Sequence, residues 1–128
     1  MKTLRKSLNG QSLVEFALVV PIFLIMILGI IEFSRLWETI NIVTSAAREG
    51  ARVAAVTAPD VSRAQTAARN VLTAGNVTQT PTITVAGPNG SSEITVTVQV
   101  AFTPFTGFVI PGIQAMNIQR AATMRWEG

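Results

Sequence analysis

A long apolar run near the amino terminus constrains the fold of this chain more than any other feature. The run covers residues 13–31, is 19 residues long and carries Glu15 as its only charge. A helix rises about 1.5 Å per residue, so this run would span about 28 Å, close to the ~30 Å hydrocarbon core of a bilayer. The sequence therefore predicts a helix that can cross a membrane.

A short basic segment precedes the apolar run. Residues 1–10 carry Lys2, Arg5 and Lys6, and positive charges beside a spanning helix tend to stay in the cytoplasm. The amino terminus is therefore expected inside and the rest of the chain outside. A secretory signal peptide also begins in this way, but its apolar region is usually shorter. In addition, no small-x-small cleavage pattern directly follows Ile31.

The composition argues against nucleic-acid binding and against most catalytic chemistry. The net charge of +3 resides in the leader, because beyond Gly10 seven Arg face seven acidic residues. No basic excess is left for nucleic acid in the folded part. The absence of Cys and His removes disulfides, thiol nucleophiles, imidazole bases and the usual zinc ligands. We therefore expect no enzyme activity, no catalytic residue, no metal, no cofactor and no small-molecule substrate.

The helical pattern continues beyond the apolar run but becomes amphipathic. Six apolar residues recur at spacings of three and four and therefore share one helix face. They are Leu36, Ile40, Val43, Ala47, Ala51 and Ala54. One helix from about residue 12 to about residue 58 would be roughly 70 Å long. The Ala and Gly residues between positions 46 and 55 would let another backbone approach closely.

A helix stop and a restart follow. Pro59 disfavours helical geometry at Ala58, and Asp60 is a favourable N-cap. A second, alanine-rich helix is predicted over residues 61–74, with Gly75 as its C-terminal cap.

Beyond the second helix, the period of the apolar pattern changes to two. Residues 82–85 and 94–102 alternate apolar and polar side chains, as strands with one buried face do. The Gly- and Pro-containing turn at residues 87–91 predicts a hairpin. A Pro- and Gly-rich loop at residues 104–112 leads to a third strand near residues 117–126. The expected fold class is α+β, with a small three-stranded antiparallel sheet.

The chain therefore divides into three expected parts. Residues 1–10 form the leader, residues 11–58 the long helix with its membrane part at about 13–31, and residues 59–128 the head. The head has 70 residues, which is marginal for an independent core without a disulfide or metal. We expect the sheet to rest on the outer half of the long helix, share its apolar stripe and fold with it as one unit.

Glu15 occupies a costly position. A carboxylate near the centre of a membrane helix costs about 2.5–3.5 kcal/mol, and less near the interface. Either Glu15 stays hydrated at headgroup level, or it has a partner. Gly10 leaves the backbone open to a protease, and cleavage after it would place an α-amino group on Gln11, four residues before Glu15. Pairing of amine and carboxylate offsets much of their desolvation cost. Between neighbouring subunits it would fix their stagger.

Three motifs resemble those of a known family. Gly10 followed by Glu15-Phe16 looks like the prepilin-peptidase site of type IV pilin-like proteins. The complete set is Gly10-Gln11-Ser12-Leu13-Val14-Glu15-Phe16-Ala17-Leu18, Ile31-Glu32-Phe33-Ser34-Arg35 and Ala46-Ala47-Arg48-Glu49-Gly50-Ala51-Arg52. In this order the motifs are similar to the TadE-like family of the tight-adherence (Flp) pilus system. The resemblance covers about the first 55 residues and is weak from Pro59 onward.

The resemblance implies a pilin-like fold and a pseudopilin function, that of an accessory subunit that assists assembly of adhesive pili. Gly10 and Gln11 would flank the bond cut by a prepilin peptidase, and Glu15 with Phe16 would serve processing, assembly or both. The candidates for helix packing or partner docking are Ala47, Arg48, Glu49, Gly50, Ala51 and Arg52.

The implied location is the bacterial inner membrane, with a cytoplasmic amino terminus, an extracytoplasmic head and the option of incorporation in a pilus. The implied partners are the membrane, the prepilin peptidase, other pilin-like subunits and the pilus assembly machinery.

Two departures and two alternatives accompany this interpretation. Gln11 stands where many type IV pilins begin their mature chain with Phe or Met, and the major Flp pilins are shorter and lack a folded head. The first alternative is an uncleaved single-pass anchor whose head binds a partner in a secretion complex. The second is an envelope enzyme, which would need clustered polar residues. From Pro59 onward the acids are only Asp60, Glu93 and Glu127, widely separated in sequence.

Overall fold

The computed structural model describes residues 4–58, 60–88, 90–108, 112 and 114–126, with only the backbone described at residues 4–9, 106 and 108. Four residues of the sequence analysis lie outside these ranges. They are Lys2 of the leader, Pro59 at the predicted helix break, Asn89 in the predicted turn, and Glu127. The elements in chain order are helix α1 (Leu4–Thr57), helix α2 (Val61–Ala74), strands β1 (Thr82–Ala86) and β2 (Glu93–Phe102), the 3-10 helix η1 (Phe105–Phe108) and strand β3 (Met116–Arg125). This arrangement confirms the predicted α+β fold.

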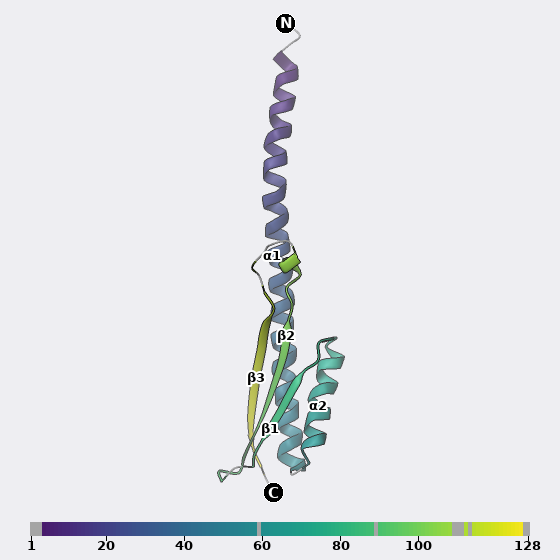
Figure 1. Ribbon diagram of the computed structural model, residues 1–128, viewed down its shortest axis with the longest axis vertical. Coiled ribbons are helices and arrows are strands. Elements are labelled where there is room, and N and C mark those ends of the chain that lie inside the picture. The colour runs from purple at the N-terminus through teal and green to yellow at the C-terminus, as the bar shows by residue number, and fades with distance from the viewer. Residues whose placement is uncertain (1–3, 59, 89, 109–111, 113, 127–128) are drawn as a thin grey trace.

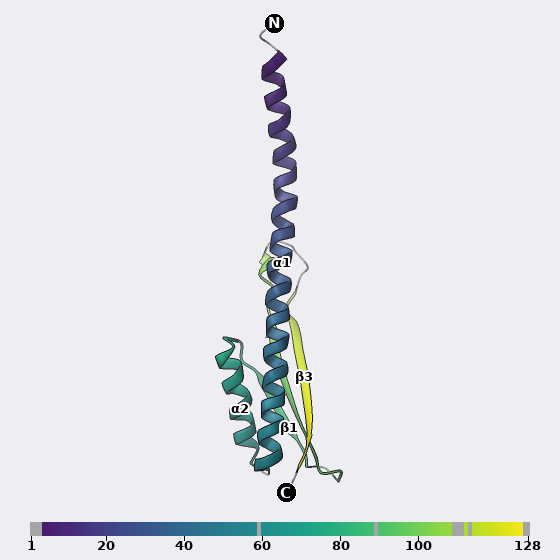
Figure 2. The ribbon, with the colours of Figure 1, turned by 180° about the vertical axis from the view of Figure 1, so that it is seen from behind.

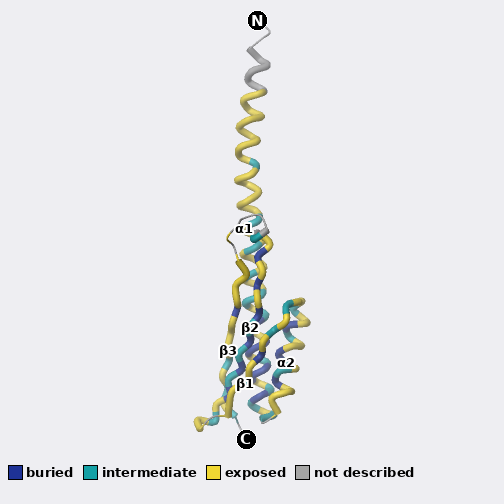
Figure 3. The backbone as a smooth tube through the Cα atoms, in the orientation of Figure 1, coloured by how far each residue is buried: buried dark blue, intermediate teal, exposed yellow. Residues whose placement is uncertain are grey.

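Helix α1 runs along the whole molecule, and the other elements gather around its C-terminal half (Figures 1 and 2). The N-terminal half protrudes alone. From Gly10 to Ile31 every residue is exposed except the half-buried Val20 and Leu28 (Figure 3). By length and composition, α1 is the one helix among the described residues that can cross a membrane. The protruding half therefore presents apolar side chains that the head does not cover.

The start of α1 differs from the prediction. The helix begins at Leu4, about eight residues before the expected start, and it includes Gly10. The leader contains no Pro, and Leu, Arg and Lys are good helix formers, so nothing in this segment stops the helix. The backbone at Gly10 is consequently helical, whereas an open backbone was expected there. Pro21 also lies inside α1 without ending it.

The sheet has the predicted antiparallel order β1-β2-β3. In the register, Val96 of the central strand lies opposite Val85 on one side and Ala122 on the other. Alternate residues of β2 are buried, and these are Ile94, Val96, Val98, Val100 and Phe102. The alternation that predicted the strands therefore corresponds to one face that packs on the helices.

The core lies where this sheet face meets α1 and α2. From α1 it contains Val43, Ala46, Ala47, Ala51 and Ala54, and from α2 Ala64, Ala68 and Leu72. This confirms that the head rests on the outer half of α1 and shares its apolar stripe. The backbone that approaches the small residues of α1 is that of α2 from the same chain, since a Cβ at Gly50 would lie 3.4 Å from the carbonyl oxygen of Ala64.

Both ends of α2 are capped. The Asp60 carboxylate accepts hydrogen bonds from the backbone N–H of Ser62 at 3.1 Å and of Arg63 at 3.4 Å, as predicted for an N-cap. At the other end, the left-handed conformation belongs to Asn76 (φ 60°), while Gly75 has φ −82°.

The C-terminal cap of α2 is a Schellman motif in which Gly75 is the cap residue, as predicted, and Asn76 is the left-handed residue after it. The Asn76 N–H donates to the Thr73 carbonyl, and the Val77 N–H donates to the Leu72 carbonyl. Gly75 is required for a different reason, because a Cβ there would lie 2.6 Å from Cγ2 of Ile42 on α1. Close approach to α1, and not a positive φ, therefore explains this glycine.

Gly50 provides the first test of the packing. A Cβ at this position would lie 3.0 Å from Cγ1 of Val96 and 3.3 Å from Cβ of Ala68. We expect Gly50→Leu to overpack the core and to lower the free energy of unfolding by about 1–3 kcal/mol. Thermal unfolding of the detergent-solubilised full chain, followed by circular dichroism, measures the effect. Gly29→Leu is the matched control, because a Cβ at Gly29 has no neighbour within 4 Å; equal melting of both variants would contradict this account.

Asp60 provides a test that depends on pH. The hydrogen bond from the Ser62 hydroxyl is the largest cause that lowers the pKa of the Asp60 carboxyl, helped by the backbone N–H groups of Arg63 and Ser62 and the charge of Arg63, and opposed by desolvation. A carboxyl with a lowered folded-state pKa stabilises the fold above its unfolded pKa, about 3.9, and this stabilisation is lost as the pH falls through the folded-state value.

Asp60→Asn keeps an oxygen for the cap but removes the titration. We therefore expect the melting temperature of Asp60→Asn to fall less than that of the wild type when the pH is lowered below about 4. Identical acid sensitivity of the two proteins would show that the Asp60 cap does not contribute in this way.

Candidate functional site

The first candidate site lies on the protruding half of α1. Gly10, Gln11, Glu15 and Phe16 are all exposed. Gln11 and Glu15 are one helical turn apart on the same face, with a rise of about 6 Å between them. Apart from the adjacent backbone of α1, a Cβ at Gly10 would have no neighbour within 4 Å. The geometry leaves this segment accessible to other molecules, and its function in processing and assembly stays a prediction.

The second candidate segment, residues 47–52, divides into a buried and an exposed set. Ala47, Gly50 and Ala51 are buried in the core of the head, while Arg48 and Arg52 are exposed and Glu49 is half-buried. Gly50 lies where α1, α2 and β2 meet. The small residues of this motif therefore pack α1 against its own head, which leaves the charged residues as the part that another chain can reach.

Two of these charged residues form an ion pair on α1. The Arg52 guanidinium donates to Glu49 from Nη2 to Oε1 at 2.6 Å and from Nε to Oε2 at 2.9 Å. This hydrogen bonding is the main cause that lowers the pKa of Glu49 and raises the pKa of Arg52. Because the pair is solvent-exposed, its effect on stability is small. Its structural consequence is that the Glu49 carboxylate already has a cationic partner.

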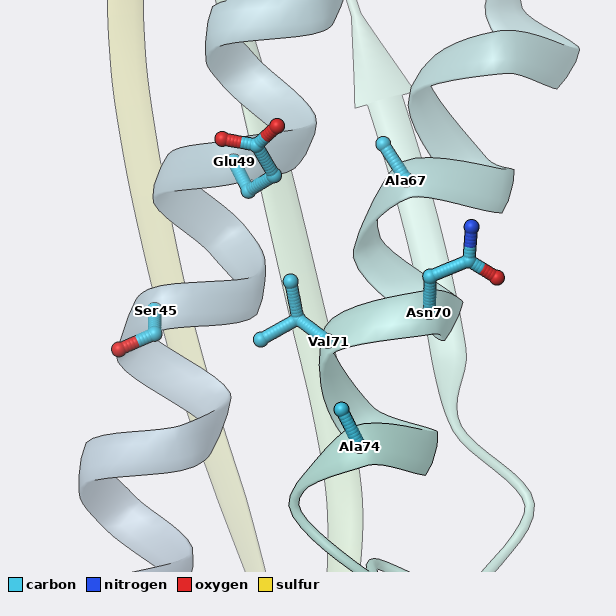
Figure 4. Close-up of a pocket in the computed structure, with 6 residues that line it drawn as sticks. All are labelled: Ser45, Glu49, Ala67, Asn70, Val71 and Ala74. Atoms are coloured by element: carbon cyan, nitrogen blue, oxygen red, sulfur yellow. The ribbon is translucent and has the colours of Figure 1, made fainter.

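An open groove of about 530 Å³ lies between α1 and α2 at the surface, beside this ion pair. Figure 4 shows the six lining residues, Ser45 and Glu49 from α1 and Ala67, Asn70, Val71 and Ala74 from α2. Most of them are small, and the one carboxylate is bound by Arg52. Among the residues that the structure describes, no three His, Cys, Asp or Glu side chains gather as metal ligands. The groove thus has the lining of a packing surface.

A third set of contacts lies where α1 leaves its apolar half, and the sequence did not reveal it as a unit. Glu32 Oε2 accepts a hydrogen bond of 3.0 Å from the backbone N–H of Phe105, and Glu32 Oε1 lies 3.4 Å from Nη1 of Arg35. The Arg35 guanidinium in turn lies 5.7 Å from the ring centroid of Phe102. Together these contacts hold the end of β2 and the start of η1 against α1.

The pairing of Glu32 with Phe105 could not be read from spacing, because 73 residues separate them. One signal was available in the sequence. Glu32 is an acidic residue that directly follows Ile31, the last residue of the apolar run. A carboxylate at this border needs either water or hydrogen-bond donors, and the structure supplies two donors from Arg35 and Phe105.

Comparison with known proteins agrees with the motifs on α1. The family model described as TadE-like protein matches residues 10–52. The matched segment contains all three motifs, and it ends before α2 and the sheet. No curated protein and no solved structure matches the chain. TadE-like proteins are associated with the tight-adherence pilus. Over residues 10–52 the predicted resemblance is therefore confirmed, since this part of the chain is similar to the TadE-like family.

Proposed function

We propose that the protein is a pilin-like (pseudopilin) subunit that assists assembly of a tight-adherence pilus. In this proposal the first half of α1 anchors the chain in the bacterial inner membrane, and the head lies on the extracytoplasmic side. The observation that carries the proposal is the division of one uninterrupted helix into two halves. The first half is apolar, exposed and long enough to cross a bilayer, and the second half forms part of the core of the head.

This division suits a subunit whose protruding half passes from the lipid of the membrane to the apolar surface of neighbouring helices. In water the exposed side chains of the protruding half, such as Leu18 and Phe23, would be unfavourable. Lipid can cover them in the membrane, and the corresponding helices of other pilin-like subunits can cover them in an assembly. Because the head is already packed on the second half of α1, neither transfer requires the head to unfold.

Processing after Gly10 would require local unwinding of α1. A protease binds an extended backbone, whereas Gly10 lies within the helix. Gly is less favourable than Ala inside a helix by about 0.8–1.0 kcal/mol, so Gly10 lowers the cost of opening the helix at this position. Cleavage would give Gln11 a positively charged amine one turn before Glu15. The two charges would then be positioned to compensate each other, within one chain or between neighbours.

Replacement of Gly10 tests the processing step. We expect Gly10→Ala to retain residues 1–10 in cells that contain the prepilin peptidase, because the added methyl group hinders both recognition and unwinding. Gly29→Ala should be processed normally. Both glycines lie in α1 with open space around them, so neither substitution creates a clash inside the chain. The intact mass and the amino-terminal sequence of protein recovered from its native membrane provide the measurement.

The outcomes separate the proposal from the uncleaved anchor. A wild-type chain that begins at Gln11 supports the pseudopilin mechanism. A wild-type chain that retains its leader in the presence of an active peptidase contradicts it and favours a permanent anchor whose head binds a partner in a secretion complex.

Glu15 tests assembly after processing. We expect Glu15→Gln, which removes the charge but keeps the size, to reduce incorporation into pilin-like complexes, because the amine on Gln11 loses its counter-charge. Glu38→Gln, at an exposed position of α1 beyond the apolar run, is the control. Crosslinking in membranes, followed by quantification of the crosslinked subunit, measures incorporation. Equal crosslinking of the two variants would rule out a charge-dependent function for Glu15 in assembly.

A further inference from the structure

Exposed apolar side chains gather at the end of the head that faces the protruding half of α1. Phe105 of η1 is 68% exposed, Phe33 is 65% exposed and Trp37 is 59% exposed. Met116, at the start of β3, is 45% exposed and lies opposite Phe102 in the sheet register. Figure 1 shows η1 beside α1 at this end of the head, while the β1–β2 hairpin lies at the opposite end. These side chains thus concentrate at one level of the molecule.

The level coincides with the expected surface of the membrane. Phe33 follows the last residue of the apolar run by two positions, and Trp37 follows it by six, which corresponds to about 9 Å along a helix. The hydrogen bond from the Phe105 N–H to Glu32 fixes η1 at the same height. A bilayer has an interfacial layer several ångströms thick on each side of its ~30 Å core. All three aromatic residues therefore fall within or just beyond that layer.

We propose that η1 and the two aromatic residues of α1 form a contact with the lipid interface of the extracytoplasmic leaflet, so that the head stands directly on the membrane. This inference rests on the membrane insertion of α1 in the proposed function. The occupant is the headgroup and upper acyl-chain region of the bilayer. The argument for lipid is continuity, since the aromatic side chains extend the apolar surface of the spanning half sideways onto the head.

The chemistry of the patch suits this boundary. Aromatic side chains are enriched at membrane–water interfaces, and the Phe33 and Trp37 rings stack with centroids 6.4 Å apart. The Glu32 carboxylate is compensated by Phe105 and Arg35, which lowers the cost of placing it at the border. The side chain of Arg35 is 45% exposed, so its guanidinium remains able to bind lipid phosphate as well. Glu32 is in this view a positioning residue that holds Phe105 at the membrane surface.

Single-tryptophan variants of the full chain in phospholipid vesicles test the proposal. The chain contains two Trp residues, and replacing both by Phe gives a background without Trp. Phe105→Trp in this background reports on η1, and Phe23→Trp reports on the middle of the spanning half. A chain that keeps only Trp126 reports on the far end of the head, where the backbone N–H of Trp126 donates to the Ser92 carbonyl. Quenching by lipids brominated close to the headgroup or deep in the acyl chains measures depth.

We expect the Phe105→Trp emission to shift to the blue when vesicles are added and to be quenched most by the shallow bromines. The Phe23→Trp emission should be quenched most by the deep bromines. The Trp126 emission should be unaffected. Quenching of Phe23→Trp without quenching of Phe105→Trp would overturn the lipid contact and leave the membrane anchor intact. Absence of quenching at both positions would overturn the anchor and the contact together.

The positioning of Phe105 by Glu32 is tested in the same vesicles. Glu32→Ala removes the acceptor for the Phe105 N–H, and we expect it to weaken shallow quenching of Phe105→Trp. Glu32→Gln keeps an acceptor oxygen and should preserve the quenching. If Glu32 served folding alone, two variants with the same circular dichroism spectrum would show the same shallow quenching.

Discussion

Burial of one sheet face on the outer half of α1 is the interaction on which the rest of the structure depends. The head supplies a short helix and three strands, and its core is completed only by residues 43–54 of α1. A small head without disulfides has little apolar surface to bury by itself. The long helix is therefore both the stem of the molecule and a structural element of the head. Any force or displacement applied to the protruding half is transmitted along α1 to its second half, which shares a core with the sheet.

Small side chains set the distances in this core. Ala46, Ala47 and Ala51 of α1 are buried in it together with Ala64 and Ala68 of α2, and Gly50 lies beside Ala68 and beside Val96 of the central strand. Several hydroxyl groups of α1, including those of Thr39, Thr44 and Thr57, donate to carbonyls four residues earlier in the same helix. The helix thus satisfies many of its own polar groups, and its contact with the head is formed mainly by apolar surface.

The sequence predicted the elements well because their patterns are local. The two-residue period of the apolar pattern identified the strands. The Pro–Asp pair and Gly75 predicted a helix over residues 61–74, and these are the observed bounds of α2. The features that it missed depend on contacts between distant residues or on competition between local signals. Asn76, and not Gly75, has the left-handed conformation at the end of α2, while Gly75 lies against Ile42 of α1. Glu32 binds Phe105 across the fold, and the helix start at Leu4 follows from the lack of any residue that stops it. Of the candidate site, the burial of Gly50 could not be read without knowing where α2 packs.

The uninterrupted course of α1 from the apolar half into the head has a rotational consequence. Each residue of an α-helix advances the chain by about 1.5 Å and turns it by about 100°. No loop separates Ile31 from Val43, so the direction in which the sheet faces, viewed along the helix axis, is set by the number of residues between the apolar half and the core. Deletion of a single residue in this stretch would leave residues 43–54 packed in the core of the head and yet turn the sheet by more than a quarter of a circle relative to the apolar half. The phase of one helix thus orients the head relative to everything that binds its apolar half.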